Sequence, residues 1–544
     1  MSAHDGPAHL AWGAVWPSLE EFTELAQSRR VIPVVEKLLI DDAAPTGIFR
    51  RLAEGTGTFI LESAEHDGSW NRWSFVGVRS QAQLIAREGT ARWEGEVPLG
   101  LEVEGPTTQL LASALDALTT KAFPGLPPLT GGLVGALGWD TLFDWEPKLT
   151  RKAQRELDIP DAVMCLTTDM VAVDHQDGTV WLISNAVNSN NTADGVEGAY
   201  SRARARLAEM EAALQRPEPL HAVKRVADVE TEVQPELRTS QADFEEAVCL
   251  GKEAIRDGEV FQVVLSQRAD IDCPADPLDV YRVLRTINPS PYMYCLRLAD
   301  GTEEGFAVVG SSPETLMRLD EGRVTTFPIA GSRPRGRTLT EDREFAEELL
   351  ADPKELSEHV MLVDLARNDL AKVCVPGTVE VIELMEIKRY SHIMHISSTV
   401  SGELAEGVRA VDCLAATFPA GTLSGAPKPR AIEIIDALEP ARRGIYGGVI
   451  GYFDFNGNAD LAIAIRTAVI SHGRASVQAG AGIVADSVPE TEFIESKNKA
   501  AAAVRAIQIA GTLAQVDARK ARDGQDSPVA GVTGYGVSEG TEEA

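Results

Sequence analysis

Short apolar runs bounded by glycine or turn residues recur through the second half of the chain and predict β-strands. They read FQVVLSQRADI, GFAVVGSS, GVIGYFDF, LAIAIRTAVI and ASVQAGAGIV. Apolar residues at helical spacing predict helices over 342–350, 353–366, 409–417, 427–437 and 490–508. The strands follow one another as hairpin-like neighbours instead of alternating with helices. We therefore expect an α+β fold, with largely antiparallel sheets in the core and helices outside.

One of these helices carries ionisable groups at its start. The centre of KELSEHVMLVDLARNDL, Lys354 to Leu370, is apolar nearly all round, which predicts a helix buried on every side. Glu355, Glu358 and His359 nevertheless occupy its first turns. Glutamates near a helix N-terminus can simply be favoured by the helix dipole. Two carboxylates on one face of a buried helix also indicate a functional site.

The distribution of tryptophan divides the chain. All eight tryptophans, from Trp12 to Trp181, lie in the first third of the 544 residues. This bias and the length predict two domains with separately built cores. A polar, proline-containing stretch separates them, and Ser240 then caps a helix. The expected order is an N-terminal extension (1–25), an N-terminal domain (26–214), a linker (215–238), a second domain (239–516) and a disordered tail rich in Gly, Asp and Glu (517–544).

A faint internal repeat relates the two predicted domains. FVGVRSQAQLIAREGTAR at 75–92 aligns with VVGSSPETLMRLDEGRVT at 308–325. Duplication of a strand and hairpin unit explains the match, and so does chance, so the sequence leaves both open.

The net charge of the chain limits the kinds of binding partner that we expect. With 51 basic and 82 acidic residues the net charge is −31, which repels nucleic acid phosphates and anionic membrane surfaces. An anionic substrate therefore needs a local basic pocket. Six scattered cysteines without CxxC or Cys/His clustering indicate neither disulfides nor zinc, and the sequence shows no export signal or apolar window of membrane length. We expect a cytoplasmic protein that binds neither nucleic acid nor membrane.

Two pairs of glutamates predict a cation site. Glu355 and Glu358 are three residues apart and share a helix face, as do Glu492 and Glu495. Because all these ligands are oxygen atoms, magnesium fits better than zinc.

Three further stretches carry more glycine or charge than packing alone requires. QAGAGIVADS and TFPIAGSRPRG, the latter with Arg333 and Arg335, are suited to anions but equally to tight turns and charged loops. In RYSHIMHISS, His392 and His395 share a face only if the segment is helical.

Seven segments together resemble a known family. PIAGSRPRG, KELSEHVMLVDLARNDL, SHIMH, FPAGTLSGAPKPRA, YGGVIGYF, DLAIAIRTA and GAGIVADSVPETEFIESKNKA resemble the chorismate-utilising enzymes, most closely the anthranilate synthase component I family. The likeness covers nearly all of 240–510 and, more weakly, the first domain. It implies a two-domain chorismate-binding fold. It also implies a lyase that uses Mg²⁺ to convert chorismate and ammonia to anthranilate and pyruvate, the first step of tryptophan biosynthesis.

The resemblance assigns roles to individual residues. The implied magnesium ligands are Glu358 and Glu495, with Glu355 and Glu492 positioning the metal or its waters. Glu314 in GSSPE is the implied general acid for the leaving hydroxyl, and His395 is the implied catalytic histidine of pyruvate elimination. The implied ligands of the enolpyruvyl carboxylate are Tyr446, Arg466, Lys499 and the backbone of Gly480, Ala481 and Gly482. The implied ring-side residues are Gly331, Ser332 and Thr422.

Two positions favour ammonia as the nucleophile. Isochorismate and salicylate synthases have a water-activating lysine where this chain has Gln262, and an amide cannot act as that base. Many aminodeoxychorismate synthases have a nucleophilic lysine where this chain has Ala330. Ser332 departs from the family's usual threonine, so it keeps the hydroxyl but loses a methyl group.

The resemblance also implies feedback inhibition and a partner. Two segments resemble the halves of the family's tryptophan inhibitor site: Leu61, Glu62 and Ser63 in FILESAE, and Pro291, Tyr292 and Met293 in NPSPYMYC. A core strand and a proline-rich turn would contain the same residues. No glutaminase Cys/His element is evident, so a separate glutamine amidotransferase subunit is expected to supply ammonia within a heterotetramer. Two alternatives stay open: aminodeoxychorismate synthase component I, and a catalytically inactive tryptophan-binding regulator.

Overall fold

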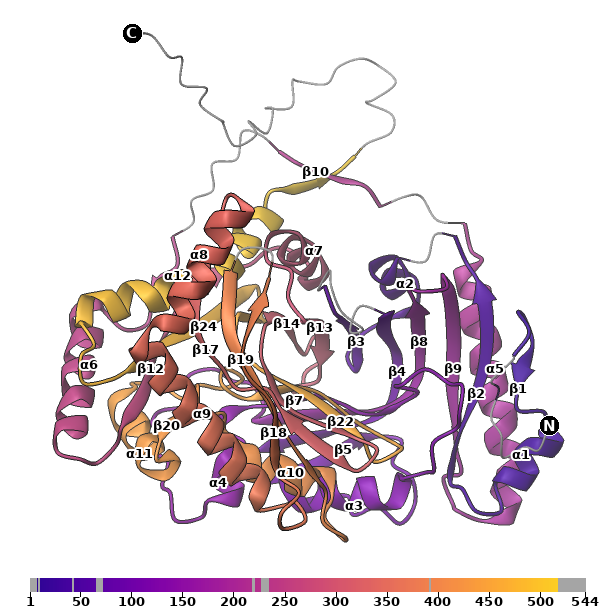
Figure 1. Cartoon of the computed structure of the whole chain (residues 1–544). Coiled ribbons are helices and arrows are strands. Elements are labelled where there is room, and N and C mark those ends of the chain that lie inside the picture. The colour runs from indigo at the N-terminus through magenta and orange to yellow at the C-terminus, as the bar shows by residue number, and fades with distance from the viewer. Residues whose placement is uncertain are drawn as a thin grey trace, which may run out of the picture.

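A twenty-three-stranded sheet forms the centre of the described chain (Figure 1). The computed structural model describes Pro7 and residues 10–41, 44–64, 72–217, 221–226, 234–390 and 393–516. The longest ladders, β4 (Trp73–Arg87) with β8 (Ala162–Asp174) and β12 (Gln262–Asp272) with β24 (Arg474–Ile483), are antiparallel. The α+β class is therefore confirmed, whereas the predicted tail, 517–544, lies outside the described ranges.

The remaining strands are mostly short. Before residue 240 they are β1 (Val15–Trp16), β2 (Val31–Leu39), β3 (Thr58–Glu62), β5 (Thr90–Gly95), β6 (Glu104–Pro106), β7 (Gly132–Leu137), β9 (Thr179–Val187), β10 (Val223–Arg225) and β11 (Glu236–Leu237). After it they are β13 (Tyr292–Leu298), β14 (Phe306–Ser312), β15 (Thr315–Asp320), β16 (Arg323–Thr326), β17 (Ile329–Pro334), β18 (Glu380–Arg389), β19 (Ile393–Glu403), β20 (Gly425–Ala426), β21 (Val449–Asp454), β22 (Ala459–Ile463), β23 (Thr467–Ser471) and β25 (Leu513–Gln515). Strands β10 and β25 pair separately from the main sheet.

The helices lie outside the strands (Figure 1). In the first half they are α1 (Leu19–Leu25), α2 (Pro45–Leu52), α3 (Thr107–Leu118), α4 (Leu142–Trp145) and α5 (Val196–Leu214). In the second half they are α6 (Gln241–Arg256), α7 (Pro277–Ile287), α8 (Leu339–Ala351), α9 (Pro353–Ala371), α10 (Ala410–Thr417), α11 (Lys428–Leu438) and α12 (Pro489–Ala510). All five helices predicted by spacing after residue 340 are confirmed. No helix of the described ranges is long and apolar enough to cross a bilayer.

Capping residues set the starts of the helices that matter most for the site. Ser240 accepts a hydrogen bond from the Asp243 backbone N–H at 3.2 Å and begins α6, as its sequence predicts. The Asp352 side chain accepts the N–H groups of Lys354 and Glu355 at the start of α9. Proline at the first position, where no N–H is needed, begins both α9 and α12.

The two halves of the chain share their hydrophobic interior. Strand β3 pairs with β13, and β7 pairs with β21, so sheet hydrogen bonds cross the predicted boundary. Each of the two large clusters of buried side chains contains residues from both halves, such as Trp16 with Tyr281 and Leu133 with Phe453. The expectation of two separately built cores is therefore wrong, because the distribution of tryptophan along the chain does not determine which strands pair. The division into domains itself stays a prediction.

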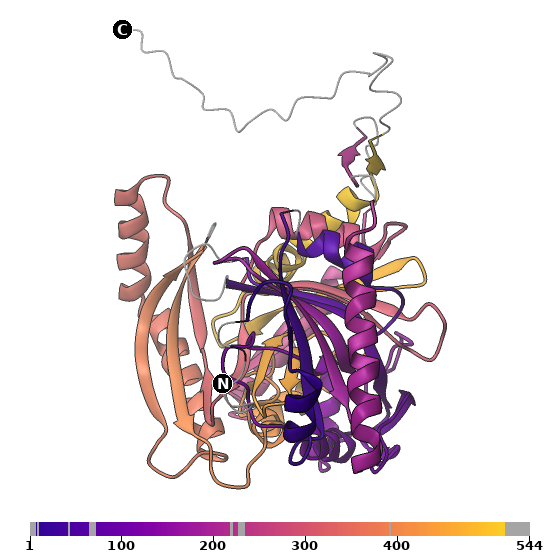
Figure 2. The same cartoon turned by 90° about the vertical axis from the view of Figure 1, so that its right-hand side faces the viewer.

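Helix α9 differs from its prediction in burial. Only one face is covered, with His359, Leu362 and Val363 buried, whereas Val360 is 45% exposed. The prediction of burial on every side is wrong because α9 packs against β17 and β19 on one face and leaves the other face to solvent. Figure 2 shows the salmon and orange strands and helix of this part of the chain at one edge of the molecule. His359 is fully buried, and its Nε2 lies 2.6 Å from the Ser398 hydroxyl, which also accepts the Met385 N–H. Its role is structural.

The apolar run LAIAIRTAVI is interrupted. It forms two strands, β22 and β23, with Arg466 between them at φ +53°. The predicted single strand is wrong because β22 pairs with β15 and β21 whereas β23 pairs with β14 and β24. Between them the Ile465 N–H donates back to the Ile463 carbonyl at 2.9 Å, which turns the chain before Arg466. A non-glycine residue in the left-handed region carries strain, and such strain is found preferentially at functional sites.

The faint repeat has a counterpart in backbone conformation. Segments 75–92 and 308–325 both form strands joined by a Glu-Gly turn, at Glu88-Gly89 and Glu321-Gly322, and all four residues have positive φ. Two-residue hairpin turns of this kind favour glycine because they require positive φ. Duplication of the unit stays a prediction.

Candidate active site

Two acidic helix starts contribute the four predicted metal-binding glutamates. Glu355 and Glu358 lie in the first turns of α9, and Glu492 and Glu495 in those of α12. Lys499, one turn beyond Glu495, forms an ion pair with it at 2.7 Å. The lysine also donates a hydrogen bond to the Gly480 carbonyl at 3.1 Å, which ties α12 to β24.

Electrostatics connect these two helix starts. Burial raises the pKa of the Glu358 carboxyl, the neighbouring charge of Glu355 raises it further, and Lys354, Lys499 and a hydrogen bond from Gln262 oppose the shift. Burial likewise raises the pKa of Glu492, where Glu495 adds to the shift, and Lys499 and Lys354 oppose it. The same two lysines therefore act on both helix starts, which places the carboxylates around one region. Lys354 was not predicted, although its spacing of four from Glu358 was a signal.

The arrangement of carboxylates suits a cation with few protein ligands. Within the described ranges, no three His, Cys, Asp or Glu side chains lie close enough together to form a metal site by themselves. Magnesium commonly takes one or two carboxylates and completes its shell with waters and an anionic ligand. The mutual repulsion within each glutamate pair is what a bound cation would relieve.

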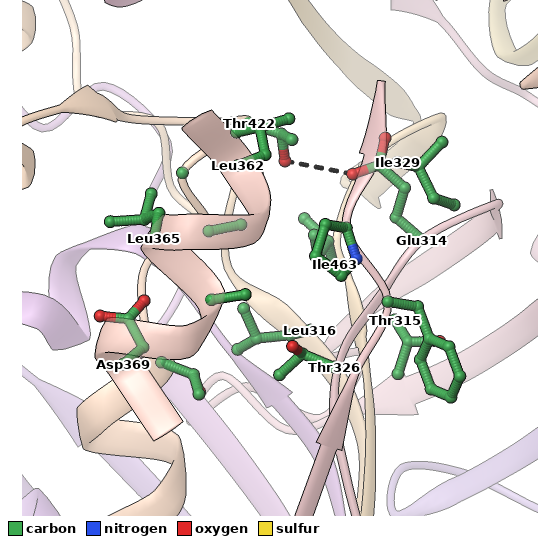
Figure 3. A pocket seen from close by; sticks show the side chains of 16 residues that line it. Glu314, Thr315, Leu316, Thr326, Ile329, Leu362, Leu365, Asp369, Thr422 and Ile463 are labelled. Carbon is green, nitrogen blue, oxygen red and sulfur yellow. Dashed lines mark hydrogen bonds between the residues drawn. The ribbon is translucent and has the colours of Figure 1, made fainter. Parts of the chain in front are cut away.

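Glu314 and Thr422 meet at one end of a cavity (Figure 3). The Thr422 hydroxyl donates to Glu314 Oε2 at 3.1 Å. Burial raises the pKa of Glu314, while Thr422, Lys499 and Arg466 act against the shift. The cavity has a volume of about 70 Å³ and lies between α9 and the strands β15 and β17. Its apolar walls include Leu316, Ile329, Leu362, Leu365 and Ile463. The sequence did not predict these wall residues, because an apolar residue that lines a cavity has the same sequence pattern as one in the core.

His395 is held in one tautomer by the backbone. It lies on β19 opposite Ser332 of β17, and its Nδ1 lies 2.9 Å from the Gly331 carbonyl oxygen. Since a carbonyl only accepts, Nδ1 carries the hydrogen and Nε2 is left to accept a proton. Burial lowers the pKa of His395, and the charges of Arg466 and Lys499 lower it further, so the neutral base predominates at pH 7. His392, the other histidine of SHIMH, lies outside the described residues.

A cationic corner lies between the interrupted strand and α12. The half-buried Arg466 donates to the Lys499 carbonyl at 3.2 Å. Burial lowers the pKa of Arg466, whereas Glu314, Tyr446 and Glu495 raise it. These interactions connect the corner with the predicted general acid, Glu314, and with α12. Tyr446 is buried, and burial raises its pKa. The structure therefore brings these predicted residues into one region.

The GAG segment lies inside β24 and is not a turn. Gly480 and Gly482 pair with Ser266 and Val264 of β12, and a Cβ on Gly480 would meet the Leu265 carbonyl oxygen at 2.4 Å. A Cβ on Gly482 would meet Gln262 Nε2 at 2.5 Å. Close approach of backbone therefore requires glycine at Gly480, whereas a side chain at Gly482 would displace the Gln262 amide.

Two ring-side residues have different surroundings. Gly331 has φ +67°, and a Cβ there would come within 3.0 Å of Glu355 Oε2, so this glycine lies beside one of the carboxylates predicted to bind metal. Ser332 is exposed. Gln262 is buried and contacts Glu358 through its amide, as its hydrogen bond to that carboxylate requires.

The arginines of TFPIAGSRPRG are occupied by acids. Arg333 forms ion pairs with Glu348 and Asp352, each at 3.1 Å. Arg335 pairs with Asp342 at 2.7 Å. Most of the segment forms strand β17 and is not the charged loop of the second interpretation, and the acids that pair with both arginines leave the anion-binding interpretation without support.

The two predicted halves of the inhibitor site are adjacent. Strands β3 and β13 pair so that Glu62 lies opposite Met293 and Leu61 opposite Tyr294, while Ser63 and Pro291 lie at the ends of these strands. The buried Glu62 carboxylate accepts hydrogen bonds from Tyr281 and from Ser74 and pairs with Arg285 at 3.1 Å. The Tyr292 hydroxyl lies 2.8 Å from both Thr315 Oγ1 and Asp460 Oδ1, and Thr315 follows Glu314 in the chain.

Comparisons with known proteins agree with this geometry. A family model described as chorismate binding enzyme matches residues 58–505. Anthranilate synthase component 1 of Arthrobacter globiformis is 53% identical over 505 residues, which cover 92% of this chain and 94% of the relative. The protein of the same name from Mycobacterium tuberculosis (strain ATCC 25618 / H37Rv) is 50% identical over 517 residues, covering 93% and 98%.

Solved structures share the fold. Anthranilate synthase component I from Streptococcus pneumoniae TIGR4 superimposes with a TM-score of 0.69 at 31% identity, covering 86% of this chain and 99% of that one. The menaquinone-specific isochorismate synthase of Escherichia coli superimposes with a TM-score of 0.65 at 18% identity, covering 90% and 98%. The fold and the site thus define a chorismate binding enzyme. Within that class the chain belongs to the anthranilate synthase component 1 family.

Proposed function

We propose that this chain is the lyase subunit that converts chorismate and ammonia to anthranilate and pyruvate in tryptophan biosynthesis. The observation that supports this most is the identity of 50–53% to anthranilate synthase component 1 over more than nine-tenths of the chain. The convergence of an acid, a base, a cationic corner and two acidic helix starts supports it independently of identity. A catalytically inactive regulator would have no reason to retain all four.

The proposed cofactor is Mg²⁺. Glu358 and Glu495 would hold it, with Glu355 and Glu492 positioning the ion or its waters. When bound, the ion would neutralise the ring carboxylate of chorismate and withdraw electron density from the ring. Lys499, which now pairs with Glu495, would be free to move toward the substrate's second carboxylate.

The remaining chemistry falls to the chain's own side chains. Glu314, whose pKa is raised by burial, keeps a proton for the leaving hydroxyl, and Thr422 orients its carboxyl. His395 Nε2 accepts a proton during pyruvate elimination, because Nδ1 is committed to Gly331. Arg466, with Tyr446, binds the enolpyruvyl carboxylate.

Ammonia is the proposed nucleophile. Gln262 cannot activate water as a lysine does, and Ala330 cannot attack the ring. We expect a separate glutamine amidotransferase subunit to supply ammonia in a cytoplasmic heterotetramer, as the component 1 name of the relatives implies a second component.

Product identification tests the proposal. The purified chain, incubated with chorismate, ammonium and Mg²⁺, is expected to form anthranilate, detected by its fluorescence and by mass. Formation of aminodeoxychorismate would favour the alternative synthase, and recovery of unchanged chorismate would favour an inactive regulator. Copurification with an amidotransferase from native extract tests the partner separately.

Feedback inhibition by tryptophan is proposed for the adjacent segments that contain Leu61, Glu62, Ser63, Pro291, Tyr292 and Met293. The pairing of β3 with β13 supports it by placing both segments side by side. Because inhibitor binding would involve strands from both halves, it would shift an equilibrium between conformations by its differential affinity for them.

Glu62→Gln is expected to raise the half-inhibitory tryptophan concentration about tenfold while leaving ammonia-dependent turnover within about twofold. An amide keeps the size of the side chain but loses the charge that Tyr281 and Arg285 contact, and a charged hydrogen bond contributes about 1.5 kcal/mol or more. Inhibition curves of initial rate measure the effect. Glu36→Gln, at another buried glutamate of the first half, is the control. An unshifted curve in Glu62→Gln contradicts the assignment.

A further inference from the structure

Arg443 is a fully engaged guanidinium beside the candidate site. It follows α11 and precedes Tyr446 by three residues, and it is 2% exposed. A buried arginine is costly unless its donors are satisfied. Its burial therefore calls for a reason beyond packing.

The planar guanidinium joins three segments. Its Nη1 donates to the Leu423 carbonyl at 2.7 Å, and its Nη2 donates to the Val264 carbonyl at 2.8 Å. Leu423 follows Thr422, and Val264 lies two residues after Gln262 on β12. The guanidinium therefore holds the backbone just after two predicted site residues, Thr422 and Gln262.

Glu439 completes the arrangement from the preceding turn. It accepts from Arg443 Nε at 2.8 Å and from Nη2 at 2.6 Å. The same carboxylate accepts the Ser266 N–H and hydroxyl, each at 2.8 Å, which adds a second attachment to β12. The Ser266 hydroxyl in turn accepts from Gln478, two residues before Gly480. The ion pair thus also reaches the strand that carries the GAG backbone.

Two aromatic rings lie against the guanidinium. Its Cζ is 4.3 Å from the centroid of Trp139 and 5.5 Å from that of Tyr446. Trp139 comes from the first half of the chain, and a Cβ on Gly447 would come within 2.9 Å of its ring. Cation–π contact of this kind strengthens when the charge is desolvated.

We propose that Arg443 is a positioning residue for chorismate binding. Its guanidinium hydrogen bonds and its two ring contacts fix the relative positions of Thr422, strand β12 with Gln262, and Tyr446. The inference deepens the proposed function and rests on it. It also gives the first half of the chain a part in the active site, since the Trp139 ring lies against the guanidinium. Arg443 itself acts through these residues and does not bind the substrate.

Arg443→Lys tests the inference. Lysine keeps the charge for Glu439 but has no planar fork, so it cannot reach both carbonyls and Glu439 at once. We expect the KM for chorismate to rise at least about tenfold, while the KM for ammonium stays within about twofold. The matched control is Arg442→Lys, because the adjacent Arg442 is half-buried and bonds Glu88 and the Ala153 carbonyl away from the site. The control is expected to keep both constants.

The outcomes separate the inference from the proposed function. Absence of anthranilate from the wild-type chain would remove the proposed function and the inference with it. With active wild type, an unchanged KM for chorismate, or a fall in turnover with both KM values unchanged, would overturn the positioning role alone. If Arg443→Lys does not fold, as a thermal melt would reveal, Trp139→Phe replaces it. That variant is expected to raise the KM for chorismate about threefold, because phenylalanine keeps only part of the ring contact. An unchanged KM would overturn the inference.

Discussion

Glu314→Gln is expected to lower the turnover of anthranilate formation about a thousandfold, because an amide cannot protonate the leaving hydroxyl and general acids contribute 10²–10⁴-fold. The amide keeps the size of the side chain and can still accept from Thr422. Stopped-time fluorescence of anthranilate measures the loss. Glu321→Gln, an exposed glutamate in the following hairpin, is the control and is expected to keep wild-type turnover.

The direction in which turnover changes with pH is a second test of Glu314 as the acid. Burial raises the pKa of Glu314, so the protonated, active form persists to higher pH than an ordinary carboxyl would allow. Wild-type turnover is expected to fall as pH rises through that raised pKa. The residual activity of Glu314→Gln should lack this descending limb. A variant that retains the limb, or that keeps more than a tenth of wild-type turnover, would show that another group donates the proton.

Glu358→Gln is expected to lower kcat/KM for chorismate by about a thousandfold and to raise the Mg²⁺ concentration needed for half-maximal rate. A metal that neutralises developing charge contributes several kcal/mol, and about 4 kcal/mol corresponds to this factor. Removal of Mg²⁺ by a chelator should reproduce the loss in wild type.

A binding readout keeps the metal prediction independent of activity. Titration calorimetry with Mg²⁺ in the presence of chorismate should show weaker binding to Glu358→Gln and to Glu495→Gln than to wild type. Asp364→Asn, at a side chain of α9 that is 64% exposed, is the control. Equal Mg²⁺ affinity in wild type and both variants would place the ion elsewhere.

Helix positions and candidate chemistry were predictable from local sequence. Ser240 marks the start of α6 because its side chain accepts a hydrogen bond from the backbone N–H of Asp243, three residues later. A spacing of three residues places each glutamate pair on one helix face, independent of the tertiary contacts of the helix. Such features depend on neighbours within a few residues. Motif resemblance then supplied roles for Glu314, His395 and Arg466 that spacing alone did not.

Burial and strand interruption were not predictable in this way. The apolar run around Arg466 is predicted as one strand, yet it divides into β22, which pairs with β15 and β21, and β23, which pairs with β14 and β24. Helix α9 reads as buried all round, yet Val360 is exposed because only one layer of strands covers the helix. Both outcomes depend on partners far away in the chain.

The sequence by itself predicted the class of chemistry: carboxylate pairs suited to a cation and, through motif resemblance, an acid and a histidine. Only the tertiary structure decided how these groups are supported. It fixed the tautomer of His395 through Gly331, occupied Arg333 with acids, and joined both halves of the chain at β3 with β13 and at Trp139 with Arg443. The physical reason is that residue type and spacing act over one or two turns of backbone, whereas burial, ion pairing and the pairing of distant strands arise only when the whole chain has packed.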